Sequence, residues 1–81
     1  MKSHTLLTLP VGGSSMIKSI HTPPAIRRRL MDLGMLPGTF VRCLYTAPSG
    51  DPGAYLVSGT VVAIGKDNAA NIFLYGGVLW D

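Results

Sequence analysis

Short runs of alternating hydrophobic and polar residues, separated by glycine and proline, extend along most of the chain. Residues 14–21 alternate with a period of two, which predicts a strand. Met16 and Ile20 fall on one face of this strand and Ile17 on the other. Further strands are predicted over residues 4–9, 39–46, 54–58, 60–64 and 72–75. Because five or six short strands with closely spaced turns are typical of a small β-barrel, the pattern predicts a mainly β fold.

One segment has the period of a helix instead. Ile26, Leu30 and Leu33 recur at i, i+4 and i+7 and form one apolar stripe, which we expect to face the barrel. Gly34 follows the last of them, and glycine readily adopts the left-handed conformation that ends many helices. The sequence therefore predicts one inserted α-helix over about residues 23–33.

Cap and turn residues mark where these elements begin and end. Thr22 offers a side-chain cap to the helix, and Pro23 suits its first turn because the N–H that proline lacks has no partner there. Pro37-Gly38 predicts a turn. Gly59 lies between two strand-like runs, and we expect a bend or bulge at this position.

The chain divides into one domain and a short tail. Residues 1–75 contain the predicted strands and helix, and a length of 81 residues suits a single domain. Within it, residues 47–53 predict a loop, and residues 65–70 predict a turn or a single helical turn. Residues 76–81 follow as a tail.

Apolar residues are abundant for a chain of this size. They make up 47% of the sequence, and charged residues 14%. A small core cannot hold them all, and apolar side chains left on a surface often mark partner sites. We take Met35, Leu36 and residues 78–80 as the candidate exposed set. Two alternatives stand for the tail, which either packs back over one end of the barrel or forms a protein interface.

Cysteine and hydropathy patterns indicate the compartment. Cys43 is the one cysteine, so neither an internal disulfide nor a multi-cysteine metal cage is expected. It alternates with Val41 and Tyr45, which predicts that all three share one strand face and that Cys43 is a small buried hydrophobic residue. No run reaches the ~18–20 apolar residues of a membrane span, and no secretory signal is recognisable. We expect a cytoplasmic protein without direct membrane insertion.

Three consecutive arginines lie in the predicted helix. Arg28 points almost directly away from the apolar stripe, and Arg27 and Arg28 are candidates for partner contacts, although a solvated helix face is the alternative. Arg28 and Asp32 are i, i+4 neighbours that could pair. Arg29 lies beside the stripe, and we expect a structural role in which its head reaches a backbone carbonyl or Asp51.

Metal-binding and catalytic patterns are missing from the sequence. His4 and His21 are far apart, and the chain contains no glutamate, so three or four converging metal ligands are not expected. No paired acid and base or activated nucleophile is recognisable, and no P-loop pattern follows the glycine pairs. We therefore predict no catalytic residues, no metal site and no cofactor.

The helix end and the following loop together resemble the signature of the FeoA proteins. The helix run is Arg29-Leu30-x-Asp32-Leu33-Gly34-x-x-Pro37-Gly38, and the loop is Ala47-Pro48-x-Gly50-Asp51-Pro52. The resemblance covers roughly residues 5–75. Its structural signature comprises Arg29, Leu30, Asp32, Leu33, Gly34, Pro37, Gly38, Pro48, Gly50, Pro52 and Gly59.

This resemblance implies a cytosolic SH3-like barrel, similar to the C-terminal domain of iron-dependent repressors. It also implies an accessory or regulatory role in bacterial ferrous iron uptake, with the membrane transporter FeoB and its cytosolic G-protein region as the partner. Assembly into a homo-oligomer stays open. Our candidate partner-binding residues are Arg27, Arg28, Met35, Leu36 and Asp51.

The alternative is a small basic barrel that binds nucleic acid, or a stand-alone regulatory domain related to the repressors. The three arginines and a net charge of +3 motivate it. The few aromatic residues are not interleaved with the basic run as a stacking surface requires, so nucleic acid is not the expected partner.

Overall fold

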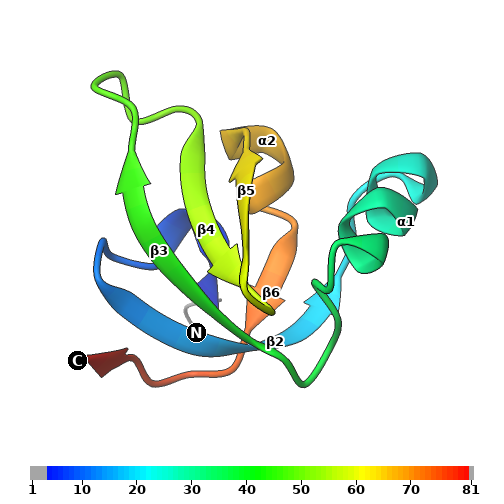
Figure 1. Cartoon of the computed structure of the whole chain (residues 1–81), viewed down its shortest axis with the longest axis horizontal. Helices are drawn as coiled ribbons and strands as arrows, with labels where there is room; N and C mark the ends of the chain where they lie inside the picture. The colour runs from blue at the N-terminus through cyan, green and yellow to red at the C-terminus, as the bar shows by residue number, and fades with distance from the viewer. Residues whose placement is uncertain (1–3, 81) are drawn as a thin grey trace.

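The computed structural model describes residues 4–80; the parts of the predicted domain and tail at residues 1–3 and 81 lie outside the described residues. Seven antiparallel strands form one strongly curved sheet in the order β1-β6-β2-β3-β4-β5, and β7 pairs with β2 (Figure 1). The strands are β1 (His4–Thr5), β2 (Gly13–Ile20), β3 (Phe40–Thr46), β4 (Gly53–Val57), β5 (Thr60–Ile64), β6 (Ile72–Leu74) and β7 (Leu79–Trp80).

Three helical segments complete the described chain, namely the 3₁₀ helix η1 (Leu6–Thr8), α1 (Pro24–Asp32) and α2 (Lys66–Ala69). The mainly β fold with an inserted helix is confirmed. The predicted strand over residues 4–9 is correct only at its start, because η1 follows two residues of β1. None of the helices that residues 4–80 form is long and apolar enough to cross a membrane.

Bulges in β2 and β3 change which side chains face the core. The pairing of β2 with β6 shifts register between Ile17 and Ser19, so Ile17 and Ile20 are both buried. Met16 is only partly buried, and the predicted face shared by Met16 and Ile20 is therefore wrong. A bulge inserts one residue and reverses the alternation beyond it.

The bulge in β3 lies between Cys43 and Tyr45. Val41 and Cys43 are buried, as predicted, whereas 61% of Tyr45 is exposed. The expectation that Tyr45 shares their face is wrong because the extra residue turns it outward.

Helix α1 ends as the sequence indicates. Gly34 adopts a positive φ of 98°. The Gly34 N–H donates to the carbonyl of Met31, and the Met35 N–H donates to the carbonyl of Leu30. These two bonds form a Schellman motif, in which the residue after the glycine packs against the last turn of the helix. Leu30 and Met35 both belong to the buried core.

The start of α1 differs from the prediction. Pro23 occupies the N-cap position, and no side chain caps the helix. The hydroxyl of Thr22 is buried and has no hydrogen-bond partner within the described residues. The predicted cap by Thr22 is therefore not formed.

A two-residue turn joins β4 to β5. Ser58 and Gly59 have φ values of 49° and 76°, and the register pairs Val57 with Thr60. Positive φ at both central residues is the type I′ geometry that suits a tight hairpin. Gly59 thus serves this turn rather than the predicted bend within a strand.

The tail returns to the barrel as β7. Its two residues pair with Gly13 and Ser14 of β2. The hydroxyl of Ser15 donates to the carbonyl oxygens of Tyr75 (2.9 Å) and Gly77 (3.0 Å), which holds the segment that leads to β7.

A candidate binding groove between α1 and β5

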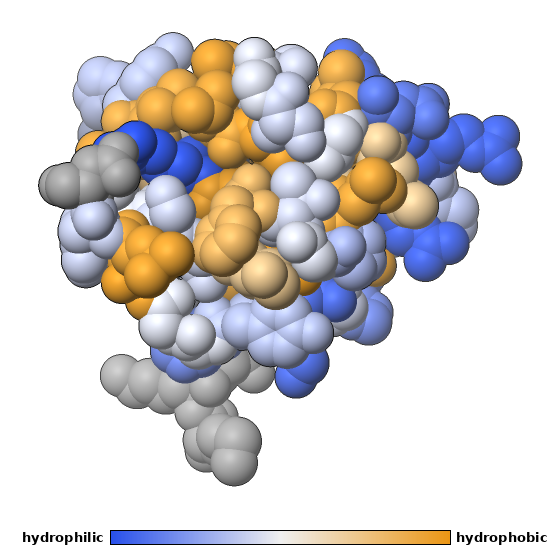
Figure 2. All heavy atoms as spheres, turned by 60° about the horizontal axis from the view of Figure 1, so that its bottom comes forward, coloured by the Kyte–Doolittle hydropathy of each residue, from blue (hydrophilic) through white to orange (hydrophobic). Residues whose placement is uncertain are grey.

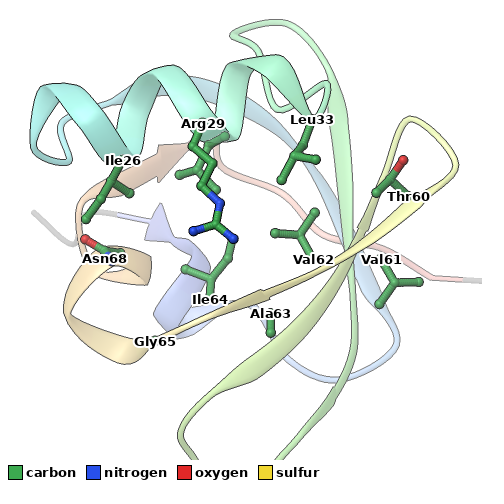
Figure 3. Close-up of a pocket in the computed structure, with 11 residues that line it drawn as sticks. Ile26, Arg29, Leu33, Thr60, Val61, Val62, Ala63, Ile64, Gly65 and Asn68 are labelled. Atoms are coloured by element: carbon green, nitrogen blue, oxygen red, sulfur yellow. The ribbon is translucent and has the colours of Figure 1, made fainter.

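An open groove of about 410 Å³ separates helix α1 from strand β5. Figure 3 shows that side chains from both elements point into the space between them. The lining residues are Ile26, Arg29, Leu30, Leu33, Thr60, Val61, Val62, Ala63, Ile64, Gly65 and Asn68. Figure 1 shows α1 at the side of the barrel, across from β5.

The apolar stripe of α1 forms one wall of this groove. Leu30 is buried in the core, Ile26 packs partly against it, and 37% of Leu33 is exposed. The prediction that the stripe faces the barrel is confirmed, although of its three residues only Leu30 is buried there. Because the helix does not lie flat on the sheet, Ile26 and Leu33 keep accessible apolar surface for a ligand.

The opposite wall is an open sheet edge. Strand β5 ends the strand order and pairs only with β4 among the described residues. In a hairpin with a two-residue turn, the pair that flanks the turn exchanges both hydrogen bonds, and such pairs then alternate along the ladder. Thr60, Val62 and Ile64 therefore bond to β4.

By the same alternation, the N–H and C=O groups of Val61 and Ala63 point away from β4. Within residues 4–80 these groups have no hydrogen-bond partner. Every residue of β5 lines the groove, including Val61 and Ala63, whose side chains are exposed outside the barrel. This is expected when the edge of a strand, rather than one of its faces, borders a groove.

Arg29 is the one charged side chain among the described residues that line the groove. It extends from α1 across the groove toward Ile64 (Figure 3). The side chain of Arg29 forms no hydrogen bond or ion pair within the described chain, so the predicted contact with a backbone carbonyl or Asp51 is not formed. Its guanidinium is therefore available to a ligand in the groove.

The two neighbouring arginines are exposed on the rest of α1. Arg27 borders a second hollow on another side of the helix, together with His21 and Met31. The predicted pair of Arg28 with Asp32 is not present in residues 4–80. Both arginines remain candidates for partner contacts.

Met35 and Leu36 differ sharply in exposure. Met35 is 0% exposed and lies in the core, whereas 40% of Leu36 is exposed. The placement of Met35 on a partner surface is therefore wrong, because the Schellman motif directs this residue inward against Leu30. Leu36 remains a surface candidate.

Asp51 fastens the loop between β3 and β4 to α2. Its Oδ1 accepts a hydrogen bond of 2.9 Å from the backbone N–H of Lys66, the first residue of that helix. Pro48, Gly50 and Pro52 lie exposed in the same loop, and Gly50 has a φ of 86°. The carboxylate thus has a structural partner 15 residues away, which the local sequence gives no means of finding.

Cys43 and Tyr55 occupy the buried interior of the barrel. Burial raises the pKa of the Cys43 thiol. Burial, and then the neighbouring Cys43, raise the pKa of the Tyr55 hydroxyl, which donates a 3.3 Å bond to the carbonyl of Leu6. The buried position of Cys43 is as predicted.

His4 and His21 have different neighbours. His21 bonds to the Ser19 hydroxyl at 2.9 Å and meets the Phe73 ring edge-on, while His4 lies beside Gly76. No group of three or more His, Cys, Asp or Glu side chains suitable for a metal ion occurs in residues 4–80.

A third hollow, of about 340 Å³, is mainly apolar, lies beside β7 and is bordered by Phe40, Tyr75 and Leu79. Figure 2 turns the bottom of Figure 1 forward and shows hydrophobic clusters separated by polar ones, with hydrophilic side chains gathered on the side of α1. Val78 packs on the core, while Leu79 and Trp80 are exposed. The tail therefore packs back on the barrel in part, and an interface through its exposed residues stays a prediction.

The curved sheet, the inserted helix and the groove between them define a small SH3-like barrel domain. A sequence profile of the FeoA domain matches residues 4–75, and the chain belongs to this family. Membership implies a role in ferrous iron transport.

Solved structures of FeoA proteins resemble this chain in both fold and sequence. A FeoA protein from Chlorobium tepidum is 34% identical, with a TM-score of 0.85 over 88% of this chain and 68% of that one. FeoA from Stenotrophomonas maltophilia, solved with zinc and described as an SH3 domain protein, is 31% identical, with a TM-score of 0.78 over 90% and 91%.

A manganese-dependent transcriptional repressor is 16% identical, with a TM-score of 0.78 over 89% of this chain and 40% of that one. This likeness concerns the fold alone. A search of curated proteins gave no significant match.

Proposed function

We propose that this protein is a cytoplasmic accessory protein of ferrous iron uptake that binds the cytosolic part of a FeoB-type transporter and adjusts its activity. The supporting observation is the FeoA domain over residues 4–75. The related protein from Stenotrophomonas maltophilia is described as a candidate activating factor for bacterial ferrous iron transport.

The groove and the exposed face of α1 form the proposed contact surface. Exposed apolar side chains next to cationic ones suit protein recognition, because apolar burial gives affinity and charge gives orientation. Arg27, Arg28 and Leu36 border this surface, and their exposure keeps them accessible to the transporter.

The test is an isothermal calorimetric titration of the 81-residue chain into the purified cytosolic G-protein region of the transporter. It is carried out with GDP, with a GTP analogue and without nucleotide. We expect saturable binding in at least one state. Arg28→Glu should weaken it without changing the thermal transition of the barrel. No association in any nucleotide state would contradict the proposed function.

A further inference from the structure

We propose that the partner contributes an extended segment that adds to the open edge of β5 as a further strand, with a carboxylate of that segment meeting Arg29. This inference rests on the proposed function, because the segment is taken to belong to the transporter's cytosolic region. It specifies how the groove is filled and by what chemistry.

Hydrogen bonding favours an extended occupant. The outward N–H and C=O groups of Val61 and Ala63 lie in the groove without partners in the described chain. Such an edge pairs with an added strand through main-chain bonds, whereas a helix has no main-chain groups left to offer. At about 3.3 Å per residue, some four or five residues would cover the five residues of β5.

Apolar contacts favour a segment with alternating side chains. Successive side chains of an added strand point to opposite sides. Those directed toward α1 meet the accessible surface of Ile26 and Leu33, while Val62 and Ile64 supply apolar atoms at the base of the groove. Hydrophobic residues at every second position of the segment fit this arrangement.

Charge favours an acidic residue in the segment. Arg29 projects into the groove, and no described lining residue is acidic. Asp51, next to Gly65 at the end of β5, already accepts the Lys66 N–H. A second copy of this chain fits less well, because two β5 edges would bring together two helices that each carry Arg27, Arg28 and Arg29. An aspartate or glutamate from the partner would form a charge-assisted bond instead.

Amide hydrogen exchange of the labelled complete chain tests the edge directly. In the absence of a partner, the Val61 and Ala63 amides should exchange faster than those of Val62 and Ile64, which bond to β4. On addition of the transporter's cytosolic region, exchange at Val61 and Ala63 should slow by about tenfold or more. Binding without slower exchange at these two amides would overturn the inference and leave the proposed function intact. If the transporter's cytosolic region did not bind this chain at all, that result would contradict both the inference and the proposed function.

Variants provide a second measurement. Ala63→Pro removes one outward N–H from an edge strand, a position where proline is tolerated, and Ala63→Val keeps that N–H. We expect the proline variant to lose at least about tenfold in affinity and the valine variant to bind normally. If Ala63→Pro does not fold, hydrogen exchange of the unmodified chain still tests whether a strand adds to the edge of β5.

Arg29→Gln should weaken binding by about tenfold, while Lys18→Gln, which removes the same charge from an exposed position on β2, should not. Equal effects of the two substitutions would contradict the role of Arg29. In the absence of the transporter, exchange at Val61 and Ala63 could also slow as the concentration of this chain rises. That result would show that a second copy of the chain occupies the edge, and it would contradict the proposed partner segment.

Discussion

The hydroxyl of Ser58 donates a hydrogen bond of 3.3 Å to the carbonyl oxygen of Gly34. Ser58 lies in the turn between β4 and β5, and Gly34 ends α1, so this contact joins the two walls of the groove at one end. Both residues have positive φ, 49° for Ser58 and 98° for Gly34. This link between α1 and the β4–β5 turn therefore depends on two left-handed backbone positions, which few residue types adopt.

Substitution of Gly34 should be more costly than substitution of Gly38 in the turn that follows. A Cβ on Gly34 would lie 2.8 Å from the Ser58 Cβ, whereas a Cβ on Gly38, at φ 90°, would meet nothing within 4 Å. Gly38→Ala carries only the left-handed backbone cost of about 1–2 kcal/mol. Gly34→Ala should lose roughly 1–3 kcal/mol more. Urea unfolding measures both, and equal losses would show that Ser58 is not a steric limit.

Met35 and Leu36 form a matched pair for testing burial. Met35→Ala should reduce the free energy of unfolding by about 2–5 kcal/mol, because it empties a fully buried site. Leu36→Ala should cost no more than about 1 kcal/mol, since its side chain is partly in water already. Denaturant unfolding of the two variants decides. A stable Met35→Ala protein would place the residue on the surface, as the sequence first suggested.

Removal of the buried Thr22 hydroxyl should not destabilise the protein. This hydroxyl has no partner among the described residues, and an unpaired buried polar group costs about 1–3 kcal/mol. Thr22→Val replaces it with a methyl group of similar volume and should leave the thermal transition unchanged or raise it. Thr22→Ser, which keeps the hydroxyl and loses the methyl group, should lower it. A large loss in Thr22→Val would reveal a bond to water.

Asp51 should contribute to stability through its acceptor oxygen. Asp51→Ala removes the bond to the Lys66 N–H and should cost about 0.5–2 kcal/mol, the usual range for a lost helix cap. Asp51→Asn retains an acceptor and should lose only part of that amount. Thermal unfolding at neutral pH compares them. Identical melting temperatures for all three proteins would contradict this role of Asp51.

Stability should fall at alkaline pH because of Cys43 and Tyr55. Both have a raised pKa in the folded state, since burial disfavours their charged forms. Their contribution is complete below the ordinary values of 9.0 and 10.0, and it is lost as the pH rises through the folded-state pKa, because unfolding then releases protons. Cys43→Ala should make the fall above pH 9 shallower. An unchanged slope would exclude a contribution from this thiol.

The helix and its end could be predicted from the sequence because the necessary signals are local. The stripe Ile26, Leu30 and Leu33, followed by Gly34, defines α1 to within one residue at each end. The burial of Met35 also had a signal, because an apolar residue directly after a helix-ending glycine commonly packs against the last turn.

Other features depend on contacts between distant segments. No glycine or proline marks the bulges after Ile17 and Cys43, since they arise from strand pairing. The bond from Lys66 to Asp51 likewise spans 15 residues. The open edge of β5 follows from the order of the strands in the sheet, which hydrophobic periodicity does not contain.

The orientation of β5 also bears on how this surface can change during evolution. Val61 and Ala63 present main-chain groups to the groove, while their side chains lie outside the barrel. Most replacements at these two positions would leave the hydrogen-bonding edge as it is, and proline is the exception. Homologous sequences could therefore diverge freely at positions 61 and 63 while the same main-chain surface persists, so that low sequence similarity there would not indicate loss of the groove.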